Sequence, residues 1–268
     1  MKSLLLGFMV LSIALLAPAI AMASPMGGEV DIATPRGEGL LELGKTEYGM
    51  LKVGFNADIV TEREMDGGPD FTGAELSGEW YSGTISYTLA DRFEPYVRLG
   101  AAAIDLEWIE TNVKREAEGD MGFAWEVGAK LFIWEWEDTG LRFSTQGSYR
   151  SYDGDYDQIT MADTIFTDIT NATYDVEEWQ VGLLVSREFD MADQVSIVPY
   201  VGVKYSDCFV DSRLTVGSAI IGPGPISSDD TVGVTVGADL LIEENLAVTI
   251  EGRFVDETAV STGCTLLF

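Results

Sequence analysis

The last two segments of the chain alternate between apolar and polar residues, and this alternation is what most restricts the fold. From residue 246 to 254, apolar side chains alternate with Ala247, Thr249, Glu251 and Arg253. The alternation resumes from 260 to 266 and stops at Phe268, the last residue. Side chains at every second position of a β-strand lie on the same face. The sequence therefore predicts two strands, each with one apolar and one polar face.

The final residues also follow a known order. A polar residue, a glycine, a hydrophobic residue and an aromatic residue follow one another up to the last position, as Ser261, Gly263, Leu266 and Phe268. A soluble edge strand usually carries charge or proline there instead. The order resembles the C-terminal assembly signal of bacterial outer-membrane β-barrels. That resemblance implies recognition by the barrel assembly machinery during biogenesis and a location in the outer membrane.

The start of the chain predicts a signal peptide over residues 1–23. Lys2 is the only charge there, residues 4–16 are apolar, and the small-x-small triplet 21–23 is a cleavage site. A transmembrane anchor is the alternative, but Pro18 interrupts the apolar run and no stop-transfer charges follow. No later segment has roughly 18 unbroken apolar residues, so a membrane span is expected to be β. Residues 24–47, with five glycines, are predicted to be a periplasmic N-terminal segment, and residues 48–268 the barrel.

The remaining chain repeats the strand pattern, with connections that are alternately long and short. The expected strands are 48–60, 75–89, 93–109, 121–134, 140–152, 174–189, 194–209, 231–242 and a closing pair within 246–268. The long loops are 61–74, 110–120, 153–173 and 210–230, and the short links are 90–92, 135–139, 190–193 and 243–245. Membrane β-barrels have an even strand number, with short periplasmic turns and longer external loops. The prediction is an all-β, closed, antiparallel up-and-down barrel of about ten strands with both termini in the periplasm.

A short phrase occurs twice in equivalent contexts. Pro95-Tyr96-Val97 and Pro199-Tyr200-Val201 each follow a tight link near the start of a strand, where a ladder tolerates proline. The phrase resembles the strand starts of small OmpA-type and opacity-type barrels, and the whole pattern resembles the small outer-membrane and porin-like barrel group. The common members of that group have eight strands, so eight is the alternative count.

The face assignment places charge inside the barrel. With the apolar face toward lipid, the polar faces carry these residues inward: Lys52, Arg98, Lys130, Arg142, Arg150, Lys204, Arg253, Asp58, Glu126, Glu178, Asp239 and Glu251. An arginine or lysine facing lipid at the midplane costs roughly 2–4 kcal/mol, and this register avoids that. Arg98, Glu126, Lys130, Arg142, Glu251 and Arg253 are expected to form an ion-pair network that narrows or closes the bore. Six tryptophans, at 80, 108, 125, 134, 136 and 179, are expected near strand ends as an aromatic girdle.

The charge and residue inventory limits the function. A formal net charge of −29 argues against nucleic acid and anionic lipid as direct partners. The sequence has no histidine, the usual general base near neutral pH, so no catalytic residue is predicted. A pair of carboxylates could still serve a glycosidase, but nothing in the sequence singles one out. No cofactor site is predicted either.

Two smaller features of the sequence bear on metal binding and on disulfide formation. Asp153, Asp155 and Asp157 resemble the start of a calcium loop, but Thr164 stands where the bidentate Glu is expected. At most a diffuse site for divalent cations at the acidic loops is expected, and no defined metal site. Cys208 and Cys264 have opposite parity in their strands, which favours two unpaired thiols over a disulfide.

The sequence thus predicts a non-enzymatic outer-membrane β-barrel with a side-chain-filled or narrow lumen, in a structural or surface-interaction role. A porin-like channel for small solutes is the alternative. Outer-membrane lipid is the expected surrounding, and a ten-stranded bore is only slightly wider than the eight-stranded bores that side chains fill.

Overall fold

The computed structural model describes residues 25–26, 49–68, 71–90, 92–162, 164–167, 169–216, 219–220, 222–243 and 245–268, with 170, 171, 216 and 219–220 described by their backbone alone. The predicted signal peptide lies outside these residues, as does all of the predicted N-terminal segment except Pro25 and Met26. No helix in the described part of the chain is long and apolar enough to cross a membrane.

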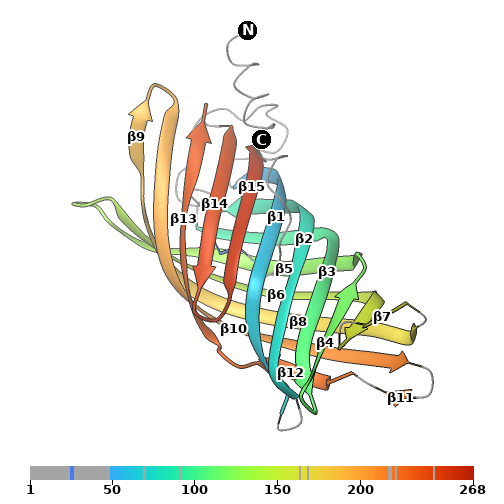
Figure 1. The fold of residues 1–268 in the computed structure, drawn as a ribbon. Helices are drawn as coiled ribbons and strands as arrows, with labels where there is room; N and C mark the ends of the chain where they lie inside the picture. The colour runs from blue at the N-terminus through green and yellow to red at the C-terminus, as the bar shows by residue number, and fades with distance from the viewer. Residues whose placement is uncertain are drawn as a thin grey trace.

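Ten antiparallel strands close into a ring (Figure 1). They are β1 (Gly49–Asp66), β2 (Phe71–Leu89), β3 (Phe93–Glu110), β5 (Gly122–Trp136), β6 (Leu141–Met161), β8 (Ile169–Arg187), β10 (Val195–Val216), β13 (Val232–Ile242), β14 (Leu246–Phe254) and β15 (Thr258–Leu267). Each pairs with the next around the ring, and β15 returns to β1. The predicted fold class and the count of ten strands are confirmed, so the eight-stranded alternative is wrong.

The seam between the last and first strands is regular. Lys52 lies opposite Leu267 and Ile59 opposite Val260 without a register shift between them. The backbone N–H of Phe268 donates to the Leu51 carbonyl at 3.0 Å, which carries the pairing to the last residue. We call the end of the barrel that holds Phe268 and the four short links the terminal end, and the opposite end the distal end.

Five short strands extend the wall. They are β4 (Val113–Gly119), β7 (Thr164–Phe166), β9 (Phe189–Ala192), β11 (Ala219–Ile220) and β12 (Gly224–Ser228). At the distal end, β4 pairs with β3 and β6, whereas β12 pairs with β1 and β10. At the terminal end, β9 forms a hairpin with β10 that stands above its neighbours (Figure 1).

Much of what was expected to be loop is strand. β1 continues past residue 60 to Asp66, β6 runs on to Met161, and β10 runs on to Val216. The ladders β1–β2 and β1–β15 shift register next to Val60, and β2–β3 shifts between Thr72 and Glu75. Such bulges insert an extra residue and break the period-two pattern, so the alternation could not be followed past them.

Around the terminal half of the barrel, the outer surface is apolar, as predicted. Phe55, Ile85, Leu99 and Leu183 point outward with 54–60% of their surface exposed. A row of aromatic side chains bounds this band on its distal side, because Trp125 contacts Tyr149 and Trp179 contacts Tyr205. Trp134 stacks on Trp136 and Phe143 at the terminal side.

The height of the apolar band fits a bilayer. Trp125 and Trp134 bound it on β5, nine residues apart along the strand. A membrane β-strand needs about 9–11 tilted residues, and membrane barrels carry such a band between two aromatic girdles. The part of the barrel distal to the Trp125–Tyr149–Trp179–Tyr205 row therefore projects beyond the membrane.

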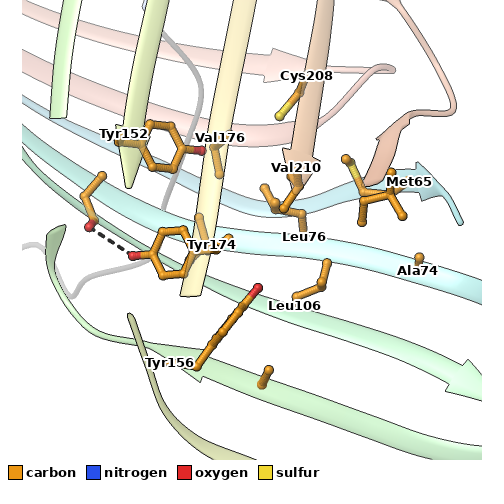
Figure 2. Packing of buried hydrophobic residues seen from close by; sticks show 14 of the residues in the cluster. Met65, Ala74, Leu76, Leu106, Tyr152, Tyr156, Tyr174, Val176, Cys208 and Val210 are labelled. Atoms are coloured by element: carbon orange, nitrogen blue, oxygen red, sulfur yellow. Dashed lines mark hydrogen bonds between the residues drawn. The ribbon is translucent and has the colours of Figure 1, made fainter. Parts of the chain in front are cut away.

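Beyond that row the polarity of the two faces reverses. Inward positions become apolar and bury the distal core, a cluster around Trp80, Leu106, Trp108, Tyr152 and Tyr174. Figure 2 shows Tyr152, Tyr156 and Tyr174 pointing into one space with side chains from the opposite strands. Outward positions there carry carboxylates instead: Glu75, Asp105, Glu107, Asp153, Asp155, Asp175, Glu177 and Asp211. This zone is built like a soluble barrel surrounded by water.

Candidate functional site

The bore of the membrane zone is lined by alternate side chains of the ring strands, and these are mostly charged. The polar alternation read from the sequence turns Asp58, Arg98, Glu126, Arg150 and Arg253 inward, and each is at most 2% exposed. A buried charge is tolerated when it is paired and hydrogen-bonded. The contacts of these side chains therefore define the candidate site.

On the distal side of the bore, Arg63 and Glu178 lie at the centre of the contacts. Arg63 donates to Glu178 at 2.7 Å, and to Ser228 and Ser206 at 3.1 Å each. Arg150 donates to the other Glu178 oxygen at 2.6 Å. Its guanidinium lies 4.9 Å from the centre of the Trp80 ring, at the boundary with the distal core. One carboxylate thus holds two arginines, Arg150 from the neighbouring strand β6 and Arg63 from β1 across the ring.

Arg253 joins this group to the closing strands. It donates to Asp58 at 2.5 Å, to Glu257 at 3.0 Å and to Glu251 at 3.2 Å. Lys204 forms ion pairs with Glu257 and, at 2.9 Å, with Asp256. The group contains these charged residues: Arg63, Arg150, Lys204, Arg253, Asp58, Glu178, Glu251, Asp256 and Glu257. We call it the bore network.

The link that carries Asp256 and Glu257 lies distal to the membrane band. Burial alone would raise the pKa of Glu257, but the charges of Lys204, Arg253 and Arg63 outweigh it and hold the pKa below its usual value. Glu257 is therefore an ionised carboxylate that pairs with Lys204, Arg253 and Arg63. Burial is the main cause that raises the pKa of Asp256, although Lys204 acts in the opposite direction.

A second group lies nearer the terminal end. Arg98 contacts Glu126 at 3.3 Å, and the Tyr96 hydroxyl donates to the same carboxylate at 2.7 Å. The Gln146 side chain donates to the Tyr96 oxygen at 3.0 Å. Lys52 pairs with Glu94 at 2.5 Å. Polar contacts therefore continue along the bore on the terminal side of the bore network.

The six residues expected to form the network are only partly brought together. Arg98 contacts Glu126 and Arg253 contacts Glu251, as two separate pairs. Lys130 is buried on β5 as well, at an inward position of its strand. Arg142 does not join the network as expected. It lies at the terminal end of the barrel, where it forms ion pairs with Glu188 at 3.4 Å and Glu135 at 3.5 Å. It belongs to the rim because its strand has only just begun there.

Three members of the bore network were missed. Arg63 fell in the predicted loop 61–74, beyond the bulge after Val60, and Asp256 and Glu257 fell between the two closing strands. The sequence offered only an isolated basic residue among acidic ones, and such a residue is more often exposed to water than buried in an ion pair. Arg63 is the one basic residue of the predicted loop 61–74.

The tryptophan expectation needs one correction. Trp125, Trp134, Trp136 and Trp179 lie on the outer surface and bound the apolar band. Trp80 and Trp108, by contrast, are 2% and 0% exposed and belong to the distal core. Both occupy inward positions in the zone where polarity is reversed, so nearness to a strand end did not place them at a membrane interface.

The outward carboxylates of the distal zone, from Glu75 on β2 to Asp211 on β10, form a surface that we call the acidic wall. Asp153, Asp155 and Asp157 lie on strand β6 rather than in a loop. In the described part of the chain, no group of three or more histidine, cysteine or acidic residues could hold a metal ion. Burial raises the pKa of Glu75 on this wall, and its acidic neighbours Glu62 and Glu107 raise it further. Both cysteines are free, with Cys208 buried in the distal core and Cys264 half-buried on the outward face.

The closed ring, the apolar band between aromatic girdles and the polar bore together define an outer-membrane β-barrel. The sequence is similar to the autotransporter β-domain family over residues 128–214. It is also 24% identical to the major outer membrane porin of Chlamydophila psittaci, over 82% of this chain and 79% of the porin.

Solved structures with a similar fold include two outer-membrane proteins of different kinds. The outer membrane protease OmpT of Escherichia coli is 9% identical, covers 82% of this chain and 96% of its own, and has a TM-score of 0.43. The β domain of the Bordetella autotransporter BrkA is 11% identical, with coverages of 82% and 98% and a TM-score of 0.43. At these identities and TM-scores the solved structures say nothing about the activity of this chain.

Proposed function

We propose that this protein is a non-enzymatic, structural or surface-interaction barrel of the outer membrane, with a bore closed by its own side chains. The observation that carries the proposal is that the bore is filled in two successive zones of different chemistry. The bore network crosses the membrane zone at its distal side, and the distal core fills the barrel beyond it. A solute would have to displace both.

The bore network suits a plug better than a wetted pore wall. Arg63 and Glu178 come from β1 and β8, which do not pair in the ring, yet their side chains meet at 2.7 Å. Arg253 on β14 and Arg150 on β6 both contact Asp58 on β1. Contacts of this kind span the bore, whereas the charges of an open channel line opposite walls with water between them.

A porin-like channel is the second candidate. The similarity to the porin of Chlamydophila psittaci favours it, because that similarity covers about four-fifths of both chains.

For an enzyme, the absence of histidine from the sequence removes the usual general base near neutral pH. A surface role agrees with the acidic wall, which would face the exterior if both termini face the periplasm, as we propose from the long distal and short terminal connections.

Conductance across planar bilayers tests the proposal. We expect the wild-type protein to give no steady current steps. Replacing Arg63 and Glu178 together by alanine removes the ion pair that spans the bore and leaves the net charge of the bore network unchanged, and Trp108→Ala opens the distal core. Each change alone should leave the barrel closed, whereas the triple variant should conduct. Arg142→Ala is the matched control, since Arg142 lies at the rim, and should change nothing.

A large and steady wild-type conductance would contradict the proposal and favour the porin. Insertion of each variant is checked by heat-modifiable migration, so that a silent bilayer can be assigned to a folded barrel. A triple variant that is inserted but silent would show that these two zones do not close the bore.

A further inference from the structure

Two residues from far outside the barrel sequence lie inside the bore. Pro25 and Met26 are both buried, and Met26 is 1% exposed. Residues 24–47 are predicted from the sequence to be a periplasmic segment, and nothing in that prediction places any of them inside the barrel. The walls around Pro25 and Met26 are formed by β6, β8, β10 and β14, through Gln146, Gly182, Tyr200 and Glu251.

The Met26 side chain occupies an apolar recess in an otherwise polar bore. It packs with Leu184 and Tyr200 as a small buried cluster of its own. The recess depends on Gly182, because a Cβ added there would overlap the Met26 methyl group and lie 2.7 Å from its sulfur. Methionine is unbranched and adapts to such gaps.

Two wall side chains bind the backbone beside this recess. The Met26 N–H donates to Glu251 Oε1 at 3.0 Å, and Gln146 Nε2 donates to the Pro25 carbonyl at 3.2 Å. Glu251 also accepts from the Tyr200 hydroxyl at 2.9 Å and pairs with Arg253. The acceptor for the segment is therefore held in position by the bore network.

A donor for a carbonyl, an acceptor for the next N–H and a side-chain recess between them form a peptide-binding site. Buried backbone groups need such partners, and side-chain recesses give peptide sites their selectivity. We propose that the bore contains a peptide-binding site and that its occupant is the Pro25–Met26 stretch of this same chain. These two residues then fill part of the bore, independently of the two zones that support the proposed function.

Oxidation of methionine in the folded protein tests this directly. Met26 is buried, whereas Met191 on the β9 hairpin is 67% exposed and serves as an internal reference. Treating the folded barrel with hydrogen peroxide and mapping sulfoxides by mass spectrometry gives a rate for each. We expect Met26 to react at least ten times more slowly than Met191. Equal rates in the folded wild-type protein would overturn the proposal.

Variants at the recess assign the protection to the site. Gly182→Val should expel the side chain and bring the Met26 rate close to that of Met191. Gly83→Val is the matched control, because the nearest atoms to an added Cβ there lie 3.9 Å away, and it should leave Met26 protected. If Gly182→Val fails to fold, Leu184→Ala should still raise the Met26 rate several-fold. A Met26 rate unchanged in a folded recess variant would also overturn the proposal.

The outcome is separable from that of the proposed function. An exposed Met26 in a barrel that still does not conduct would remove the peptide site and leave the closed barrel standing. A protected Met26 in a wild-type barrel that conducts would leave the peptide site and remove the closure.

Discussion

At the scale of single residues, Glu178 joins the two arginines of the bore network that come from β1 and β6. It accepts from Arg63 and Arg150, and it is 2% exposed. Removing one partner of a buried ion pair leaves an uncompensated charge, which is far more destabilising than the loss of a surface pair. The carboxylate of Glu178 therefore matters more to stability than those on the acidic outer wall.

We expect Glu178→Gln to lower the free energy of unfolding by about 3–5 kcal/mol, because two buried arginines lose their shared carboxylate. Urea unfolding of the barrel in lipid vesicles, followed by tryptophan fluorescence, measures this. Arg213→Ala removes a highly exposed ion pair with Asp211 and is the control, with no measurable change expected. Equal effects of the two substitutions would argue against a tightly coupled network.

A second residue-scale feature is the packing of tyrosine over glycine inside the barrel. A Cβ at Gly128 would lie 2.5 Å from the Tyr96 hydroxyl oxygen and 2.8 Å from the Gly147 carbonyl oxygen. Tyr96 cannot move away freely, because its hydroxyl bonds to Glu126. Gly128→Ala should therefore destabilise the barrel by roughly 1–3 kcal/mol. Gly83→Ala meets nothing closer than 3.9 Å and should stay within about 0.5 kcal/mol of wild type in the same unfolding assay.

At the scale of elements, the alternation located all ten ring strands but not their distal ends. In the membrane zone, apolar residues face lipid, so the pattern from Val53 to Ile59 could be read directly. Past the bulge after Val60 the inward set becomes Arg63 and Met65, and apolar side chains change sides relative to the membrane. If the inward face is assumed to be polar along the whole strand, the predicted strand ends at this bulge. Contacts across the ring, such as Arg63 with Glu178, depend on the stagger of the strands, which the sequence does not state.

The last strand, β15, closes the ring by pairing with both β14 and β1. Phe268 extends that pairing through its N–H to Leu51, and it is the final position of the sequence resembling an assembly signal. We expect Phe268→Asp to leave unassembled protein, whereas Phe268→Tyr, which keeps the aromatic ring, should assemble. Heat-modifiable migration of outer-membrane fractions is the measurement. Normal assembly of Phe268→Asp would show that the terminal aromatic residue is dispensable.

At the scale of the whole molecule, the barrel combines two environments in one ring. In the membrane zone the outside is apolar and the inside charged, and in the distal zone the outside is acidic and the inside apolar. Each zone buries the side chains that its surroundings disfavour. The distal core stabilises the projecting part, and in the closed barrel that we propose it also covers the bore.

Cys208 allows the closure to be measured in almost native protein. It faces the bore within the distal core and is 1% exposed, whereas Cys264 is half-buried on the outward face. With Cys264→Ala, a single thiol remains to report on the bore. A charged, water-soluble methanethiosulfonate reagent is added to the folded barrel in vesicles, and labelling is followed by mass. The closed barrel predicts no labelling of Cys208 until the protein is denatured, whereas rapid labelling of the folded protein would show that water and solutes reach the distal core and that the bore is open.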